Sequence, residues 1–491
     1  MAHVMPFSDA VPLNEVNAAL GTARQFEESL RALFPPSTPS LTRYGFLFPA
    51  LQSDPAAMLP ESPQTVQALK NLGRTMSEPG TNATLDSAIP SAYTYLGQFV
   101  DHDITLMAMP SDIDFNDPNL APLPPAEVDK IKNARTPTLD LDNVYGEAPL
   151  VGGDSMLLGT VTKTGHRPPG KVGDDFDLPR TGRSKDRAYD RVARIGDPRD
   201  EENTIIAQLH IAFLRAHNFI VAGGYTYCEA RSLLRRYYQL IVIHDFLKRV
   251  ANPTIVDSML AGPWNVYDPP DDKFFMPLEF AAAAYRFGHS MVRAAYDINE
   301  HFPAEFAHLP RLFNVLSRYP TLPEEWLVQW EHFVEGGSNK ARQIDTQLVE
   351  PLFTLPGMPG VPGGEEIRLA SRNLLRGYVL RLPTGQAVAR ALGLQALTNK
   401  EIEEVAANAE QLAVLRASGF SSRTPLWFYI LAEAAHFKRD HLGPVGSTLV
   451  AGVLIALIRR SKDSVLKFPD RTPTLSETFK LPDLLRLARV L

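Results

Sequence analysis

The segment at residues 95–105 reads YLGQFVDHDIT and carries two side chains that together can bind a small polar substrate. On a helix, Gln98 and His102 are four residues apart and therefore share one face. Asp101 flanks that face, whereas Asp103 is turned about 100° further round than His102 and points elsewhere. A histidine placed in this way can accept a proton at neutral pH. Taken alone, the segment fits equally well an acidic helix end in solvent with a structural histidine.

Hard oxygen ligands gather in a second segment, TPTLDLDNVYG, at residues 136–146. Thr136, Asp140 and Asp142 offer side-chain oxygen atoms, and main-chain carbonyls can complete a coordination shell. Ca²⁺ takes roughly six to eight oxygen ligands, whereas Zn²⁺ prefers His or Cys, and this segment has neither. The spacing is not that of an EF-hand. On this segment alone, an Asx-type turn is the favoured interpretation, with calcium as the alternative.

A Gly-Asp-Pro turn at residues 196–198 opens the third segment, in which acidic residues precede a long apolar helix. The acidic residues suit the positive end of the helix dipole. Arg199 and Glu202 are three residues apart and can face one ligand; the alternative is an exposed capping cluster. Further along, His210 and His217 are seven apart on one apolar face. We expect these two to be packed core histidines rather than ligands.

Small residues precede a histidine in the fourth segment, FAAAAYRFGHSMV, at residues 280–292. The four alanines bring a helix close to a flat or bulky partner, and Gly288 lets His289 approach it. One histidine in a groove of small residues is what an axial haem ligand requires. In isolation, a tight helix–helix contact around a core histidine is the favoured interpretation.

The fifth segment, SRNLLRG at residues 371–377, places Asn373 and Arg376 on one helical face. A carboxamide can accept the second ring N–H of a ligating histidine. A guanidinium can bind a carboxylate such as a haem propionate. A polar helix face in solvent is at least as good an interpretation of this segment by itself.

Proline clusters separate long stretches of helical apolar spacing, because proline does not fit in a helix interior. The spacing predicts helices over residues 93–107, 203–222, 229–250, 277–294, 386–392, 424–436 and 445–458. Alternating strand patterns are scarce, and the best candidate for a short hairpin arm is 156–164. The Gly/Pro tract at 356–364 is predicted to be a loop and not a phosphate cradle. The predicted fold is mainly α, with an extended arm at 1–40 and one large helical domain with long loops at 41–491.

The composition is that of an ordinary globular protein, with 491 residues of which 44% are hydrophobic and 21% charged. Such values exclude collagen-like, low-complexity and wholly disordered chains. The net charge of -7, without any basic run, argues against a nucleic-acid partner. Cys228 is the only cysteine, so no intrachain disulfide can form.

The N-terminal residues lack the basic start and apolar stretch of a signal peptide. The longest apolar window, 445–458, is too short to span a bilayer. We therefore expect a cytoplasmic protein without a membrane span, with leaderless export left open. The sequence does not determine the oligomeric state.

In their order along the chain, the five segments resemble the animal-type haem peroxidase superfamily. The matching motifs are GQFVDHD, TPTLDLDNVYG, GDPRDEEN followed by LHIAFLRAHN, YRFGH and RNLLRG. The resemblance extends from about residue 40 to the end, and the joint pattern is far more specific than any one segment. The chain is similar to compact bacterial-type members, and the resemblance implies their single helical domain.

The resemblance assigns distal roles residue by residue. Gln98 and His102 correspond to the distal glutamine and the distal catalytic histidine, and Arg199 corresponds to the distal arginine. Asp101 and Glu202 lie at or beside the two carboxylates that form ester bonds to haem methyl groups in mammalian members. The implied cofactor is a b-type haem, for which we expect partial linkage through either carboxylate.

The proximal roles follow in the same way. His289 corresponds to the proximal iron ligand, Asn373 to its hydrogen-bond partner and Arg376 to the propionate-binding arginine. Asn203 stands where a mammalian member has a methionine bonded to a haem vinyl group, so we expect no such link. The resemblance also implies a calcium site beside the distal helix, with the ligands Asp103, Thr136, Thr138 (through its carbonyl), Asp140 and Asp142.

The implied activity is that of a peroxidase that reduces hydrogen peroxide and oxidises halides, pseudohalides or small aromatic donors through a ferryl intermediate. His102 would remove the proton of the peroxide as general base. Arg199 would stabilise the negative charge that builds as the O–O bond breaks. Asn373 would make His289 more basic.

Two other functions fit parts of the same sequence. Fatty-acid dioxygenases of the cyclooxygenase or α-dioxygenase type use a radical tyrosine three residues before the proximal histidine. This chain has Arg286 at that position and Tyr285 one residue earlier. An inactive haem- or calcium-binding interaction protein is the third reading. The intact pair of His102 and Arg199 favours an active peroxidase.

Overall fold

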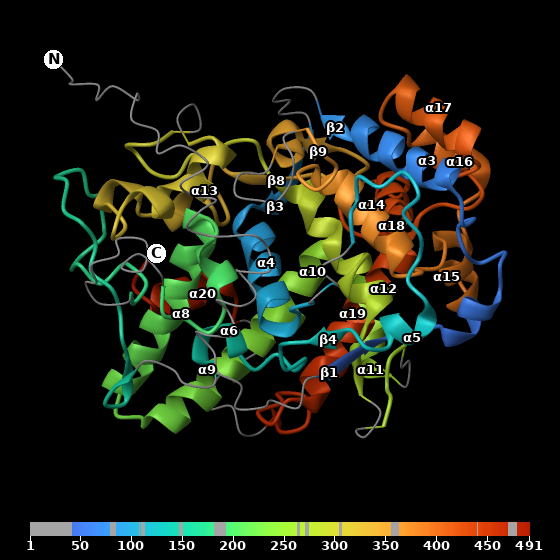
Figure 1. The fold of residues 1–491 in the computed structure, drawn as a ribbon. Helices are drawn as coiled ribbons and strands as arrows, with labels where there is room; N and C mark the ends of the chain where they lie inside the picture. The colour runs from blue at the N-terminus through green and yellow to red at the C-terminus, as the bar shows by residue number, and fades with distance from the viewer. Residues whose placement is uncertain are drawn as a thin grey trace, which may run out of the picture.

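A computed structural model gives the fold of the chain (Figure 1). It describes residues 42–491 except for 79–84, 108, 110–112, 147–150, 181–192, 263–265, 271–273, 304–306, 355–362, 439 and 470–478. The predicted arm at 1–40 and most of the predicted loop at 356–364 therefore lie outside the described residues.

Helices make up most of the regular structure, which confirms the predicted mainly α fold class. The α-helices are α3 (Pro63–Thr75), α4 (Ala92–Ile104), α5 (Pro125–Val128), α6 (Asp142–Tyr145), α8 (Thr204–Ala222), α9 (Tyr227–Ile241), α10 (Leu247–Val250), α11 (Pro253–Ala261), α12 (Leu278–Ala281), α13 (Leu309–Arg318), α14 (Leu369–Val379), α15 (Gly385–Ala391), α16 (Asn399–Glu404), α17 (Ala409–Ser418), α18 (Leu426–His436), α19 (Pro444–Arg460) and α20 (Leu481–Leu487). A π-helical turn joins α9 to α10, and the described 3₁₀ helices are η1 (Pro49–Ser53), η3 (Pro198–Glu201), η6 (Ala284–Met291), η7 (Glu324–Trp326), η8 (Trp330–His332) and η9 (Glu350–Phe353).

The strands are short and pair into small sheets that join distant parts of the chain. They are β1 (Thr42–Gly45), β2 (Ser77–Glu78), β3 (Asp86–Pro90), β4 (Lys132–Asn133), β5 (Val151–Gly152), β6 (Ser155–Met156), β7 (Phe275–Pro277), β8 (Lys340–Arg342) and β9 (Leu348–Val349). In the described part of the chain, β1 pairs antiparallel with β4 and parallel with β7. The pairs β2–β9, β3–β8 and β5–β6 form two-stranded sheets.

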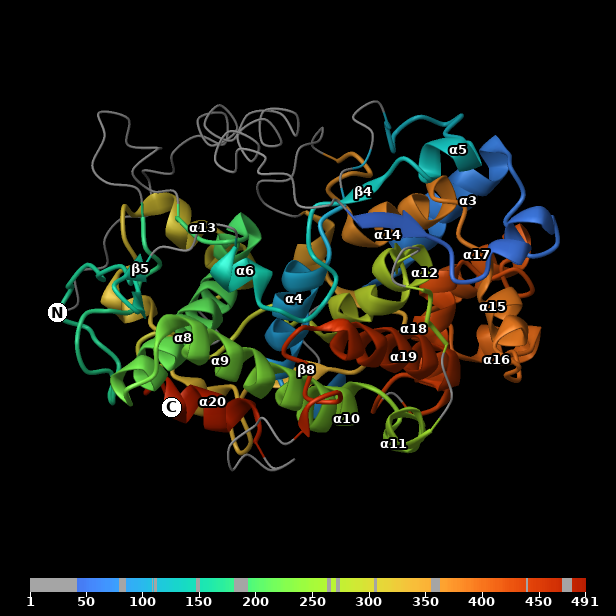
Figure 2. The same cartoon turned by 90° about the horizontal axis from the view of Figure 1, so that it is seen from below.

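Helix α4 lies in the middle of the molecule. Helices α8, α9 and α20 lie on one side of it, and α12, α14, α18 and α19 lie on the other (Figures 1 and 2). The ring of Phe99 on α4 stacks on Phe213 of α8, with the ring centroids 4.4 Å apart. The opposite side of α4 packs against η6. Buried apolar residues from Tyr44 to Val490 form one core cluster around these elements.

Most of the predicted helices are confirmed to within a few residues, as α4, α8, α9 with its continuation into α10, α15, α18 and α19. The start of α8 follows from the sequence, because the side chain of Asn203 accepts a hydrogen bond from the backbone N–H of Ile206 at 3.0 Å. Arg459 and Arg460 form the last turn of α19, where positive charge suits the helix dipole.

The predicted single helix over 277–294 is wrong. The chain forms the short α12, then the 3₁₀ helix η6, and is extended at Val292. A 3₁₀ helix has about three residues per turn, so residues three apart lie above one another. Apolar spacing could not reveal the change, because residues 281–284 are all at most 2% exposed and no polar face marks the helix period.

The predicted hairpin arm at 156–164 is displaced toward the N-terminus. Val151 pairs with Met156 in the β5–β6 hairpin, and residues 157–164 make only isolated bridges. The reversal occurs at Gly153, which has a φ of 74°. A two-residue hairpin turn requires such a left-handed residue, and glycine adopts it readily.

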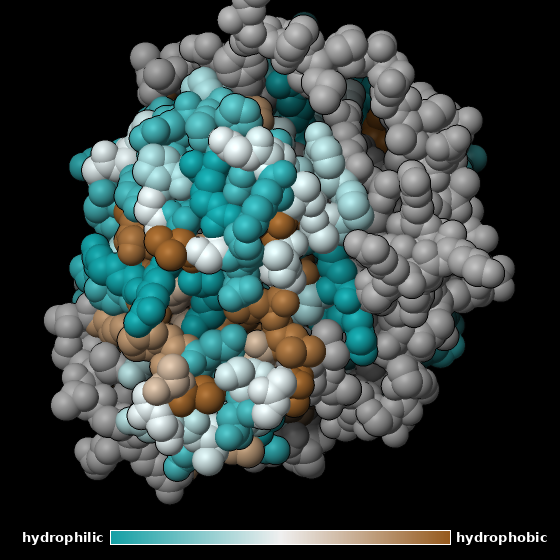
Figure 3. All heavy atoms as spheres, turned by 90° about the vertical axis from the view of Figure 1, so that its left-hand side faces the viewer, coloured by the Kyte–Doolittle hydropathy of each residue, from teal (hydrophilic) through white to brown (hydrophobic). Residues whose placement is uncertain are grey.

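The face that contains α8 and α9 is largely hydrophilic, with apolar atoms in small groups mainly in its lower half (Figure 3). Among the described helices, α8 is the one long and apolar enough to cross a membrane, but 72% of its most apolar window is buried inside the protein. Its buried side chains include Phe213, which packs on Phe99 of α4. Such burial is typical of a core helix.

A buried carboxylate joins α18 to the start of α19. Glu433 accepts hydrogen bonds from the backbone N–H groups of Val445 at 2.9 Å and Gly446 at 3.1 Å. These N–H groups belong to the first turn of α19, and the N–H groups of a first turn have no carbonyl partner inside their own helix. Burial raises the pKa of Glu433 to about 8.

Replacing Glu433 by Gln is expected to flatten the pH dependence of stability. An unfolded glutamate titrates near about 4.3, so between that pH and the folded pKa the folded protein binds the extra proton. Stability from this group is therefore fully present below about pH 4.3 and is lost as the pH rises through about 8. Urea unfolding should show wild type losing at least about 1 kcal/mol more than the variant between about pH 5 and pH 9. Equal losses in the two proteins would contradict this assignment.

Candidate active site

The face of α4 that carries Gln98 and His102 docks onto the turn that contains η3. His102 is 4% exposed, and its Nδ1 lies 2.7 Å from Oδ1 of Asp200. One helical turn earlier, the Gln98 amide donates to a carboxylate oxygen of Glu202. Gln98 and His102 therefore share one face of α4, as predicted. This face lies against the segment that starts with the Gly-Asp-Pro turn at residues 196–198.

Asp200 is fully buried between two histidines. Its second oxygen, Oδ2, lies 2.7 Å from Nδ1 of His210 on α8 and accepts from the Asn143 amide at 2.9 Å. Burial raises the pKa of Asp200, but the hydrogen bonds from His102 and His210 outweigh it, and the pKa is lowered overall. His210 is a buried histidine as predicted, yet it also belongs to this polar cluster.

Arg199 is held in place along most of its guanidinium. Its Nε and Nη2 donate to the buried carboxylate of Asp197 at 3.0 and 2.7 Å, and Nη2 also reaches the carbonyls of His102 and Thr105. The remaining nitrogen, Nη1, lies 4.0 Å from Asp101. Among the described residues Nη1 has no hydrogen-bond partner, so this nitrogen is available to a ligand.

The two carboxylates beside this site differ in their surroundings. Asp101 accepts from the Thr105 hydroxyl at 2.8 Å and is 26% exposed. Burial raises the pKa of Glu202, although the charges of His102 and Arg199 and the hydrogen bond from Gln98 act against it. Glu202 is therefore harder to ionise than a glutamate in water.

His289 lies in η6, on the other side of α4. Burial, followed by the charges of Arg286, Arg376 and Arg372, lowers the pKa of His289 well below 6.5. The ring is therefore neutral and has a lone pair to offer. A Cβ added at Gly288 would meet nothing within 4 Å, so there is open space beside the histidine.

Asn373 on α14 contacts His289 as the sequence predicts. Its amide nitrogen lies 2.8 Å from Nδ1 of the ring, and its Oδ1 is buried with no partner among the described residues. A half-turn of the amide exchanges these two atoms and lets Oδ1 accept a ring N–H. That orientation leaves Nε2 of His289 unprotonated and free to bind a metal.

Trp427 on α18 supports the proximal side. Its ring lies edge-on to His289 with centroids 6.5 Å apart, and its indole N–H donates to the carbonyl of Arg286 at 3.1 Å. Trp427 and Asn373 both line a small pocket behind the histidine.

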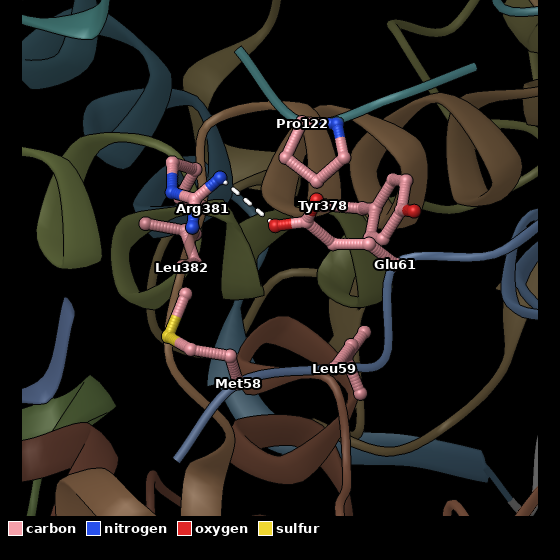
Figure 4. A pocket seen from close by; sticks show the side chains of 7 residues that line it. All are labelled: Met58, Leu59, Glu61, Pro122, Tyr378, Arg381 and Leu382. Carbon is pink, nitrogen blue, oxygen red and sulfur yellow. Dashed lines mark hydrogen bonds and ion pairs between the residues drawn. The ribbon is translucent and has the colours of Figure 1, made fainter. Parts of the chain in front are cut away.

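A neighbouring pocket lies at the C-terminal end of α14, between residues 58–61, Pro122 and residues 378–382 (Figure 4). An ion pair between Arg381 and Glu61, 3.0 Å apart, lies at its rim. It shares Leu59, Tyr378 and Leu382 with the pocket behind His289. Each pocket has room for about one water molecule, so neither admits a larger substrate.

Tyr44 of β1 connects the two sides. It is 1% exposed, and burial raises its pKa. Its hydroxyl is close enough to feel the charges of Asp101 and Arg199 on one side and of Arg286 and Arg376 on the other. Charged groups from the His102 side and from the His289 side thus both act on this buried tyrosine.

The aspartate-rich loop lies directly against the end of α4. Asp103 points away from His102, as predicted, and its Oδ1 accepts from the backbone N–H of Asp142 at 2.6 Å. Its Oδ2 is buried without a partner among the described residues. Burial, then the charges of Asp142 and Asp140, raise the pKa of Asp103 well above its usual range.

The other predicted oxygen ligands are partly engaged. Thr136 donates its backbone N–H to Asp142 at 3.1 Å, and the Thr138 hydroxyl donates to Asp140 at 2.6 Å. The hydroxyl of Ser461 donates to the other oxygen of Asp140. Over the described residues, no three His, Cys, Asp or Glu side chains converge as a ready-made metal site. Asp140 would have to reorient in order to join Asp103 and Asp142 around a cation.

A sequence model of the family described as "Animal haem peroxidase" matches residues 122–418, more than half of the chain. The chain belongs to the animal haem peroxidase family. The matched range contains Arg199, His289, Asn373 and Arg376 but begins after α4. Membership implies a haem cofactor and oxidoreductase chemistry, and it confirms the resemblance drawn from the sequence.

Curated relatives agree at low identity. Dog thyroid peroxidase is 27% identical over 293 residues, which cover 53% of this chain and 29% of the relative. Peroxinectin A of Dictyostelium discoideum is 25% identical over 257 residues, which cover 50% of this chain and 45% of that protein. The chain thus spans less than half the length of these animal haem peroxidase relatives.

Solved structures share the fold. Peroxidase A from Dictyostelium discoideum has a TM-score of 0.59 at 17% identity, and the match covers 86% of this chain and 89% of that one. A fatty acid α-dioxygenase from Arabidopsis thaliana has a TM-score of 0.54 at 13% identity, with 88% and 74% covered. At these identities the likeness concerns the animal haem peroxidase fold alone.

The residues around His289 fit a haem. The Nε atoms of Arg286 and Arg376 and the Oδ1 of Asn373 are buried without partners among the described residues. Burial and neighbouring guanidinium charges lower the pKa of Arg376. A buried cationic cluster of this kind is stabilised by anionic groups, and the two propionates of haem supply them.

Sequence reasoning missed several residues of this site. The sequence presents Asp200 as one of several acids at a helix start and Asp197 as part of a turn. It presents Arg286 only as the residue at the position where a dioxygenase has a tyrosine. Tyr44 lies outside every motif. The three charged residues stand within the quoted motifs. The available signal was that each lies close in sequence to a predicted site residue, and a charged residue is rarely buried unless it is paired.

Replacing Asp197 by Asn is expected to lower the free energy of unfolding by about 3 kcal/mol, because two partly buried guanidiniums lose the fully buried carboxylate with which they pair. Arg135 and Arg199 both bind this carboxylate, which is fully buried, and their charges hold its pKa far below the usual range despite burial. Urea denaturation measures the change.

The matched control for this prediction is Glu127→Gln. It breaks an exposed ion pair with Lys130, 2.7 Å long, and should change stability by less than about 1 kcal/mol. If both substitutions have equal effects, the buried pairs of Asp197 do not carry the stability assigned to them.

Proposed function

We propose that the chain is a haem peroxidase that reduces hydrogen peroxide and oxidises a halide, pseudohalide or small aromatic donor. The observation that carries the proposal is the pairing of His102 with Arg199 on one side of a buried region and of His289 with Asn373 on the other, with Tyr44 in reach of both sides. Bound haem would supply the redox chemistry that cleaves the O–O bond. The partners are peroxide and a small donor.

On the distal side, His102 is the proton acceptor. Its Nδ1 is engaged by Asp200, and among the described residues its Nε2 has no hydrogen-bond partner. The free nitrogen takes the peroxide proton as general base. Arg199 keeps its charge because Asp197 lies beside it, and its free Nη1 stabilises negative charge on the departing oxygen. Gln98 and Glu202 border the same space.

On the proximal side, His289 would hold the haem iron and Asn373 would orient its ring. Arg376 and Arg286 would hold the haem propionates. Ester linkage through Glu202 or Asp101 belongs to the same proposal, and the hydrogen bond from Gln98 to Glu202 fixes that carboxylate where it borders the site.

A fatty-acid dioxygenase is the second candidate, because one observation favours it. Tyr285 is 6% exposed and stacks on Phe280 with centroids 4.8 Å apart, and its hydroxyl has no partner among the described residues. A buried tyrosine of that kind suits a radical. Against it, the residue three before His289 is Arg286, so the peroxidase is the better supported function.

Replacing His102 by Gln is expected to retain haem but slow the absorbance change after mixing with hydrogen peroxide by about 100-fold or more, because the general base is lost. Stopped-flow spectroscopy measures this rate. His436→Gln on α18 is the control, since His436 is partly exposed and its ion pair among the described residues is with Glu401 at 3.7 Å. It should react like wild type.

His289→Ala is the companion variant and should lose most of the haem absorbance during purification. A wild-type rate in His102→Gln protein that retains haem would contradict the peroxidase. Consumption of dioxygen with a long-chain fatty acid, without added peroxide, would support the dioxygenase instead.

We also propose that Ca²⁺ binds at Asp103, Asp142, Asp140, Thr136 and the carbonyl of Thr138. The unpartnered, buried Oδ2 of Asp103 beside two further carboxylates supports the site. A divalent cation relieves the repulsion among them. Because Asp103 follows His102 directly, the ion would also fix the end of α4.

Asp103→Asn is expected to have opposite effects with and without calcium. In chelator it should raise the unfolding temperature, because a buried charge beside two others is removed. With calcium added, wild type should gain stability and the variant should gain little, because a ligand charge is missing. Thermal unfolding followed by circular dichroism measures both, with Mg²⁺ as the matched ion. No calcium-dependent shift in wild type would contradict the site.

A further inference from the structure

A single buried carboxylate contacts three side chains from three separate elements. Asp200 is fully buried. Its two oxygens lie within hydrogen-bond distance of side-chain nitrogens of His102 on α4 (2.7 Å), His210 on α8 (2.7 Å) and Asn143 on α6 (2.9 Å). A buried anion is expensive unless both of its oxygens find donors. Asp200 meets that condition with three donors.

The chemistry of the carboxylate determines where the histidine protons lie. Ionised aspartate only accepts hydrogen bonds, so each histidine that contacts it must carry its proton on the contacting nitrogen. His102 and His210 both contact Asp200 through Nδ1. In the neutral ring the other nitrogen is then the unprotonated one.

We propose that Asp200 is a positioning residue that keeps the proton of His102 on Nδ1 and thereby directs the lone pair of Nε2 into the site. The inference rests on the proposed peroxidase function, in which His102 takes the peroxide proton. The proton passes from the peroxide to Nε2, and the Nδ1–H remains bonded to Asp200 throughout. Without the carboxylate, His102 is free to adopt the opposite tautomer, in which Nε2 already carries a proton.

His210 and Asn143 hold the carboxylate so that it cannot turn away. Both bind Oδ2, and among the described residues Oδ1 is bound by His102 alone. The ring of His210 packs edge-on against Phe99 of α4, with centroids 6.2 Å apart. Its Nε2 is buried without a partner among the described residues, so hydrogen bonding fixes this ring through Nδ1 only. His210 therefore acts through Asp200, which explains a polar group in an otherwise apolar helix face.

The backbone fixes the position of Asp200 as well. The N–H of Asp200 donates to the carbonyl of Asp197 at 3.1 Å, in the tight turn of η3. The neighbouring Glu201 points to a different region, where its carboxylate binds Arg180 and the backbone N–H of Ala193. The two adjacent acids thus contact different partners, so a substitution of Glu201 is a matched control for a substitution of Asp200.

The tautomer is measured directly by long-range ¹H–¹⁵N spectra of histidine-labelled holoprotein in its reduced, carbon monoxide-bound form at alkaline pH. The His102 signals are assigned by their loss in His102→Gln. We expect wild-type His102 to be protonated on Nδ1, Asp200→Ala to show the Nε2-protonated form, and Asp200→Glu to restore the wild-type pattern. Glu201→Gln should leave the His102 signals unchanged.

The same variants are then mixed with hydrogen peroxide. Asp200→Ala, at full haem content, should lower the rate constant by about 10- to 100-fold, as for other residues that orient a functional histidine. Asp200→Glu should recover most of the loss, and Glu201→Gln should react like wild type.

The outcomes separate the two claims. An Nε2-protonated His102 in wild type, or an unchanged His102 tautomer in Asp200→Ala, overturns the positioning role. The wild-type spectrum decides this even if Asp200→Ala does not fold. A wild type that shows the expected tautomers but does not react with peroxide overturns the proposed function and leaves Asp200 as the residue that sets the tautomer.

Discussion

Two buried carboxylates, Asp197 and Asp200, hold the turn of η3 against the end of α4, and the rest of the site depends on this contact. Asp197 forms ion pairs with Arg135 and Arg199, and Asp200 accepts from His102 and His210. Neither carboxylate could stay ionised in the interior without these donors. Removing any partner would leave a buried charge, so the contact forms as a unit. The positions of His102 and Arg199 therefore depend more on charge compensation than on apolar packing.

The opposite side of α4 has the reverse electrostatic character. Burial lowers the pKa of Arg286, and burial together with the charge of Arg286 lowers that of Arg372 to about 10. The distal turn is rich in carboxylates, whereas the proximal side is rich in guanidiniums, and Tyr44 lies within reach of both. A flat macrocycle with a cationic centre and anionic propionates matches this division of charge. The family's cofactor thus agrees with the electrostatics of the chain's own residues.

Sequence reasoning predicted what local periodicity and capping control. The helices α4 and α8 are placed within a few residues, because α4 keeps a regular apolar face and Asn203 caps α8. It failed where burial is uniform, as in the alanines before η6, and where one glycine shifts a turn, as at Gly153. Asp200 could not be predicted, because its partners come from three elements whose approach depends on tertiary packing. A motif shows which residue types are present, but not which of two adjacent acids faces the histidine.

The 3₁₀ geometry of η6 bears on the choice between the two candidate activities. With about three residues per turn, Arg286 lies directly above His289, whereas Tyr285 is turned about 120° away and lies above Gly288. In an α-helix the residue four positions earlier would have come close to the histidine face instead. Here the residue that shares the face of His289 is a guanidinium, and the tyrosine stacks on Phe280. The sequence therefore has a cation three residues before His289, where the dioxygenases are expected to have their radical tyrosine, and the 3₁₀ turn keeps that cation on the histidine face. The same geometry places Arg286 where its guanidinium would meet an anionic edge of a cofactor held by His289.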